Sequence, residues 1–123
     1  MLHSNITKEI LDSAYKVHST LGPGLLESAY RACLVYELRN KNLKTEEEKP
    51  LPLIYEEVKL EVGYRIDIFV EQKVVVELKN VEEFRDVHTA QVLTYLQLSK
   101  CQVGLLLNFY TKSLKDGIRR VVL

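Results

Sequence analysis

Apolar residues recur every three or four positions in the first third of the chain and predict two amphipathic helices. The first is expected over residues 7–21, ended by Gly22-Pro23-Gly24, and the second over residues 25–39. The apolar stripe of the second helix consists of Leu26, Tyr30, Cys33, Leu34 and Leu38. Glu27 falls between Leu34 and Leu38 on the helical wheel, so a carboxylate is predicted on the core side.

The pattern then changes to the two-residue period of β-strands. A first strand is expected over residues 43–53, at an edge or irregular because it contains Pro50 and Pro52. A second is expected from Lys59 into the alternating residues 64–70, and a β-branched third strand over residues 74–79.

The register of the two central strands follows from their side chains. A two-residue turn at Glu71 and Gln72 would place Ile66 opposite Glu77 and mix charge with core. A three-residue connection instead places Asp67 opposite Glu77, and we predict this register although the connection contains no glycine. The other face would then be uniformly apolar, made of Tyr64, Ile66, Ile68, Val70, Val74, Val76 and Leu78.

The last third of the chain predicts one helix and one or two strands. Asp86 is expected to cap a helix that runs to Ser99. The apolar residues 102–109 follow this helical crossover, so their strand should run parallel to residues 74–79. Residues 121–123 are a candidate edge strand. The order ααβββαβ, with this final edge strand, predicts an α/β fold: a central mixed sheet flanked by helices.

Composition narrows the class of protein. The 123 residues suit a single domain over residues 1–123, and 17 Lys and Arg balance 17 Asp and Glu, so no overall basic field indicates nucleic acid. The only basic concentration is Lys112, Lys115, Arg119 and Arg120, which is either a candidate patch for binding a nucleic-acid backbone or a solvated edge.

No run approaches the roughly 20 apolar residues of a membrane span, and the N-terminus lacks a secretory segment, so a cytoplasmic protein is expected.

The candidate chemistry lies in the two central strands. Asp67 and Glu77 would face each other with Lys79 beside them, and two converging carboxylates repel unless a cation lies between them. Mg²⁺ prefers carboxylate and carbonyl oxygens, so Asp67, Glu77 and the Leu78 backbone carbonyl form a plausible metal shell. Lys79 could then hold or deprotonate a metal-bound water. The alternative for these residues is ordinary surface charge.

Two further groups of residues leave alternatives open. Glu27 either forms a structural ion pair with Arg31 or is a third acid facing the pair. His88, Gln91 and Tyr95 lie along one stripe of the third helix, which either donates and accepts hydrogen bonds at the charged sheet face or is a hydrated surface.

These residues carry a resemblance to a known family. Residues 24–30, Gly-Leu-Leu-Glu-Ser-Ala-Tyr, match the motif that names the GxxExxY proteins, and the similarity continues through five further segments. That family resembles a small branch of the PD-(D/E)XK nucleases, so a restriction-endonuclease-like fold is expected. One departure is Ile66, which stands where the superfamily has its eponymous proline. The further segments are residues 64–67, 76–79, 88–96, 105–109 and 114–118.

The resemblance implies roles for individual residues. Asp67 and Glu77 would bind Mg²⁺ or Mn²⁺, and Lys79 would assist the attacking water. Glu27 would complete or support the metal shell, and Gln91 would orient the site. Further supporting residues would be Tyr30, His88 and Tyr95.

Three hypotheses follow for the function. The first is a metal-dependent nuclease that hydrolyses phosphodiesters of DNA or RNA, as a homodimer if it cuts both strands of a duplex. The second is a catalytically silent nuclease-fold module that binds nucleic acid or a protein partner. The third treats the acids and Lys79 as a structural charge network only.

Overall fold

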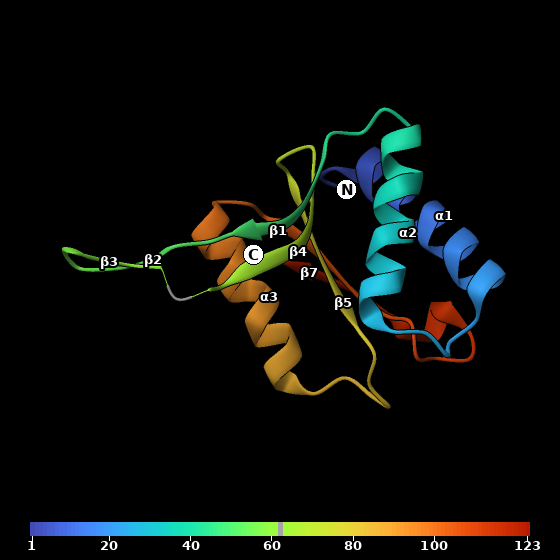
Figure 1. Cartoon of the computed structure of the whole chain (residues 1–123). Coiled ribbons are helices and arrows are strands. Elements are labelled where there is room, and N and C mark those ends of the chain that lie inside the picture. Colours follow the sequence, from blue (N-terminus) through green and yellow to red (C-terminus); the bar gives the residue numbers. More distant parts are fainter. Residues whose placement is uncertain (62) are drawn as a thin grey trace.

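The computed structural model describes residues 1–61 and 63–123 and contains three α-helices around a five-stranded sheet (Figure 1). The elements in chain order are α1 (Ser4–Leu21), α2 (Glu27–Asn40), β1 (Thr45–Pro50), β2 (Leu53–Tyr55), β3 (Val58–Leu60), β4 (Arg65–Val70), β5 (Val74–Lys79), α3 (Asp86–Ser99), β6 (Val103–Asn108), the 3₁₀-helix η1 (Leu114–Gly117) and β7 (Ile118–Val122).

The sheet has the strand order β1-β4-β5-β6-β7 and is mixed. Only β5 and β6 are parallel, and α3 is the crossover between them, as predicted. The expected edge strand exists as β7, but it already begins at Ile118. Helices α1 and α2 cover one face of the sheet and α3 covers the other (Figure 1). The predicted α/β architecture is therefore confirmed.

The sheet separates two apolar clusters. One joins α1 and α2 to the sheet, for example through Ile10, Leu34 and Val76, and the other joins α3 to the opposite face through Val92 and Val75. Strands β5 and β6 contribute side chains to both clusters. This double burial explains their nearly continuous apolar sequences, because neither face of either strand meets water.

The predicted register of β4 and β5 is confirmed. Phe69 pairs with Val75 and Val70 with Val74, so the connection has three residues. Glu71 and Gln72 both adopt left-handed conformations, at φ 55° and 54°, without glycine. The Lys73 N–H donates to the Val70 carbonyl at 3.0 Å and closes the turn.

The prediction that Ile66 shares a face of the sheet with Ile68 and Val70 is wrong. Ile66 packs in the α3 cluster, whereas Ile68 and Val70 pack against α1 and α2. The regular ladder is interrupted at Asp67 on both sides: Glu48 of β1, at φ 49°, is not paired opposite it, and the pairing with β5 ends at Ile68. Without a regular ladder at Asp67 the strand can twist, and Ile66 before the break packs toward α3.

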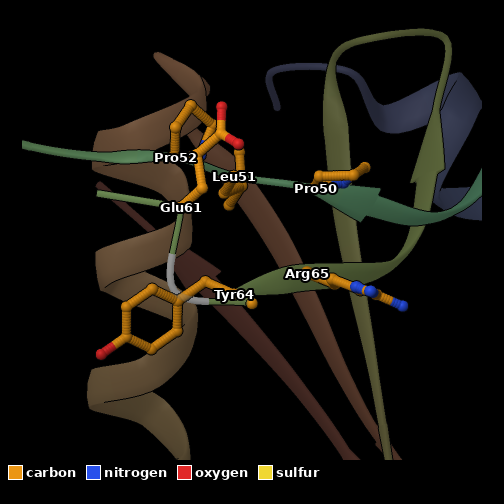
Figure 2. A pocket seen from close by; sticks show the side chains of 7 residues that line it. Pro50, Leu51, Pro52, Glu61, Tyr64 and Arg65 are labelled. Carbon is orange, nitrogen blue, oxygen red and sulfur yellow. The ribbon is translucent and has the colours of Figure 1, made fainter. Parts of the chain in front are cut away.

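The predicted first two strands are also divided differently. Strands β2 and β3 pair only with each other, in a hairpin that projects from the sheet between β1 and β4 (Figure 1). Pro50 and Pro52 lack the N–H groups that a continuing ladder needs, so β1 ends there. The Leu51 N–H donates to the Tyr64 carbonyl at 2.8 Å and closes the hairpin base (Figure 2). The strand predicted from Lys59 also crossed residue 62, which lies outside the described residues.

Three helix starts differ from the predictions. Helix α1 begins at Ser4, three residues before the expected start. Helix α2 begins at Glu27, and Leu26 is its exposed N-cap, 74% accessible, not part of the buried stripe. Helix α3 has Arg85 at its N-cap, while Asp86 occupies the first turn. Within residues 1–61 and 63–123, none of the helices is both long and apolar enough to cross a membrane.

Gly117 provides a test of the packing under β7. A Cβ at this position would collide with the Asn108 carbonyl oxygen and lie 2.8 Å from the Thr111 Oγ1, and the backbone cannot easily give way. We expect Gly117→Ala to lower the free energy of unfolding by about 2 kcal/mol, measured by urea denaturation. The control Gly24→Ala has open space around the new methyl group and should change stability by less than about 0.5 kcal/mol. Equal effects would contradict this packing.

Candidate active site

Two carboxylates stand where the backbone ladder between β4 and β5 stops. The last paired residues on this side are Ile68 and Val76. Beyond them, the Asp67 N–H donates to Glu77 Oε1 at 3.0 Å, and the Leu78 N–H donates to Asp67 Oδ2 at 2.8 Å. Each acid thus accepts a hydrogen bond from the other strand, and the two side chains occupy the fork where the strands separate.

Burial makes this pair electrostatically unfavourable. Glu77 is 3% exposed, and burial, followed by the charge of Asp67, raises the pKa of its carboxyl to about 9. Burial also raises the pKa of Asp67, against the opposing effect of the Leu78 N–H. The metal-free pair therefore retains a proton at neutral pH, and a multivalent cation could take its place.

A chain of hydrogen bonds links Lys79 to α3. The Lys79 Nζ donates to Gln91 Oε1 at 3.1 Å, and Gln91 Nε2 donates to the Tyr95 hydroxyl at 3.2 Å. Burial raises the pKa of the nearly buried Tyr95, so its hydroxyl stays neutral and accepts the bond that orients the Gln91 amide. The structure thus brings together Lys79, Gln91 and Tyr95, all of which the sequence singled out.

Glu27 lies at the first position of α2, near the pair. Burial and then the Asp67 charge raise the pKa of Glu27, while the charges of Lys79 and Arg31 oppose this. Arg31 does not form an ion pair with Glu27 but approaches Glu47 at 3.8 Å and Glu48 at 3.7 Å, on β1. The structure thus places Glu27 within the electrostatic reach of Asp67 and Lys79.

Tyr30 fixes the loop that delivers Glu27. Its ring is fully buried and stacks on Phe109, with the centroids 4.5 Å apart. Its hydroxyl donates to the Gly22 carbonyl and accepts the Leu25 N–H at 3.0 Å. Asn80 Nδ2, directly after β5, donates to the Leu25 carbonyl at 3.1 Å, so the start of α2 is tied to the end of β5.

His88 caps the N-terminus of α3. Its Nδ1 accepts the Arg85 N–H at 2.9 Å, which assigns the proton of the neutral ring to Nε2. Partial desolvation and the nearby cations Lys79, Arg85 and Arg119 lower the pKa of His88. The neutral form that the cap requires is therefore favoured.

The four basic residues near the C-terminus do not share one face. Arg119 and Arg120 are consecutive in β7 and point to opposite sides of the sheet. Arg119 donates to Thr89 Oγ1 at 2.7 Å beside α3, whereas Arg120 donates to the Leu2 carbonyl at 2.8 Å beside α1. Lys112 and Lys115 are exposed in the segment before β7. The role of these four residues in binding nucleic acid stays a prediction.

Two residues at the site had no predicted function of their own. Asn108 lies opposite Lys79 at the end of β6, and its amide exchanges hydrogen bonds with Val81 at 2.7 and 3.2 Å, which fixes the loop after β5. Its signal in the sequence is a polar residue that ends the apolar run. Arg31 lies near both Glu27 and Asp67 and lowers the pKa of each, against the larger effect of burial. Its signal is its position one helical turn after Glu27.

The fork contains two acids, Asp67 and Glu77. Among residues 1–61 and 63–123, His, Cys, Asp and Glu side chains do not form any group of three or more that could hold a metal ion. Asp67 and Glu77 would therefore need the backbone or water as additional ligands. A direct ligand role for Glu27 stays a prediction.

Comparison with known proteins identifies the family. A family model of the PD-(D/E)XK nuclease superfamily matches residues 4–121. The chain belongs to this superfamily. The PD-(D/E)XK membership agrees with the observed α/β architecture, a mixed sheet flanked by helices as in restriction endonucleases. No curated protein and no solved structure matches the chain significantly.

The buried pair predicts an unusual pH dependence of stability. The pKa of Glu77 in the folded protein, about 9, exceeds the ordinary value of 4.5, so the folded state binds more protons between these pH values and loses stability as the pH rises. Glu77→Gln keeps an acceptor for the Asp67 N–H. Because Gln does not ionise, the variant avoids the loss of stability that ionisation of Glu77 causes. In chelator we expect the variant to melt at least about 4 °C above the wild type at pH 8, and the difference to vanish near pH 4.5.

The matched control is Glu83→Gln, which removes an exposed acid outside the pair and should leave the melting temperature unchanged. A Glu77→Gln variant that melts below the wild type at both pH values would favour the structural charge network instead.

Proposed function

We propose that this PD-(D/E)XK protein is a Mg²⁺- or Mn²⁺-dependent nuclease that hydrolyses phosphodiester bonds of DNA or RNA. The observation that carries the proposal is the Asp67–Glu77 pair, in which Glu77 is buried and Asp67 half-buried, and which retains a proton next to a lysine held by Gln91. Nucleases of this superfamily generally use divalent metals, and a buried pair of acids favours such an ion.

The donor groups at the fork suit a hard cation. One oxygen of each acid accepts a backbone N–H, which leaves Asp67 Oδ1 and Glu77 Oε2 as candidate ligands. The Lys79 carbonyl accepts the Phe109 N–H on the β6 side, so the preceding Leu78 carbonyl points to the β4 side, as the Leu78 N–H does. Asp67, Glu77 and the Leu78 carbonyl would thus hold the metal. When bound, it would acidify a water molecule and offset the charge of the phosphate oxygens.

The side chains around the fork would position the reactants. Lys79 has three N–H donors, of which one is used by Gln91, so the others can hold the attacking water or a phosphate oxygen. Gln91, oriented by Tyr95, restricts where these donors point. Glu27 approaches from the start of α2 and supplies an acceptor that can orient the same water. Cutting both strands of a duplex would require a second site, which a two-fold homodimer would supply.

The direct test is cleavage of labelled single-stranded and double-stranded DNA and RNA with Mg²⁺ or Mn²⁺. We expect Asp67→Asn and Lys79→Ala to lower the rate at least about 100-fold, because each removes a group that stabilises the transition state. Glu83→Gln, purified in the same way, should cut like the wild type. Equal cutting by all four proteins would indicate a contaminating nuclease. Salt-sensitive binding without cutting would favour the silent binding module.

Gln91 should act on catalysis through Lys79. Gln91→Leu removes the acceptor of the Lys79 hydrogen bond, so the ammonium group is no longer oriented. We expect kcat to fall about tenfold with little change in KM, and Tyr95→Phe to have a smaller effect in the same direction. Gln97→Leu on the exposed side of α3 is the control, and steady-state kinetics is the measurement. A loss confined to KM would contradict this positioning role.

A further inference from the structure

A hollow of about 430 Å³ lies beside the proposed catalytic site, between the base of the β2–β3 hairpin and α3. We call it the α3 hollow. It shares Gln91 and Tyr95 with the hydrogen-bond chain that holds Lys79. Tyr64 lines it from the hairpin base. Figure 2, a view of another pocket at that base, shows the Tyr64 ring in front of the α3 ribbon. The other lining residues are Leu53, Val87, His88, Ala90, Thr94 and Leu98.

The lining suits a flat aromatic ligand with polar edges. The surface is mostly apolar, and none of its nine lining residues is acidic, in contrast to the fork next to it. Tyr64 is 43% exposed and presents a ring face, while Gln91 and Thr94 offer hydrogen-bonding groups. His88 adds a neutral imidazole, because its Nδ1 already accepts the Arg85 N–H. Nucleobases stack on apolar and aromatic surfaces and form hydrogen bonds with the few polar groups there.

The position of the α3 hollow determines which part of a nucleotide it can bind. Gln91 Oε1 accepts a hydrogen bond from the Lys79 ammonium and Gln91 also lines the hollow, so the two places share this residue. A nucleotide likewise joins a base to a phosphate. A phosphate at Lys79 would therefore leave an attached base beside Tyr64 and Tyr95.

We propose that the α3 hollow binds an unpaired nucleobase next to the phosphate that is cut, so that the substrate is single-stranded DNA or RNA or an unpaired end. In a duplex both faces of a base are covered by its neighbours and its pairing edge is occupied, so it cannot enter the hollow without leaving the stack. This inference rests on the proposed nuclease function for the phosphate at Lys79, but base binding itself needs no cleavage.

The test is equilibrium binding of a fluorescent single-stranded oligonucleotide and of the matching duplex, measured by anisotropy in chelator and again in Ca²⁺. We expect the single strand to bind at least about tenfold more tightly than the duplex in one or both conditions. Tyr64→Ala removes the exposed ring and should weaken single-strand binding about tenfold. The control Tyr36→Ala removes a ring that is 65% exposed on α2, away from the hollow, and should have no effect.

A second pair of variants does not depend on the hairpin. Ala90 lines the hollow and Gln97 is exposed elsewhere on α3, so Ala90→Glu and Gln97→Glu add the same charge in different places. We expect only Ala90→Glu to weaken single-strand binding, since the new carboxylate enters the hollow.

The outcomes separate this inference from the proposed catalysis. Single-strand preference that is lost in Tyr64→Ala and Ala90→Glu supports base binding even if no nucleic acid is cut. Cutting that requires Asp67 and Lys79, with equal binding of strand and duplex in both conditions, overturns base binding and leaves the nuclease proposal intact. Equal binding by both members of each variant pair would also overturn it.

Discussion

The mutual repulsion of Asp67 and Glu77 is the constraint around which this part of the fold is arranged. Two carboxylates at the fork of β4 and β5 replace backbone partners: each accepts an N–H that a regular ladder would have satisfied. These two N–H groups keep partners only while an acceptor stands at each position, yet burial opposes the ionisation of both acids.

The surrounding elements hold this fork in position from three directions. Helix α2 is anchored through Tyr30 and Asn80, which connect the loop before Glu27 to the end of β5. Helix α3 contributes Gln91, and Asn108 secures the chain that leaves β5. Below these contacts lie β5 and β6, which are buried on both faces and provide a rigid base. Asp67, Glu77 and Lys79 thus lie at the edge of the two most completely buried strands.

The sequence predicted what depends on alternation and burial. The register of β4 and β5, the parallel β6 and the edge strand β7 all follow from where apolar residues must go. It did not predict the β2–β3 hairpin or the placement of Ile66, because both depend on local backbone conformation near Pro50 and Glu48. The side-chain cap of α3 by His88 was missed for a similar reason. Periodicity does not distinguish a ring that accepts a backbone N–H from one that faces water.

The closed base of the hairpin has an evolutionary consequence. Because the Leu51 N–H binds the Tyr64 carbonyl, the sheet is already complete on either side of the excursion, and the five-stranded core does not use β2 or β3 for pairing. Insertions, deletions and exchanges in this hairpin would change the rim of the α3 hollow while leaving the acids at the fork untouched. If the hollow binds a ligand, a superfamily chain of this kind could vary its choice of ligand separately from the acids at the fork, by changing a segment that the five-stranded sheet does not use for pairing.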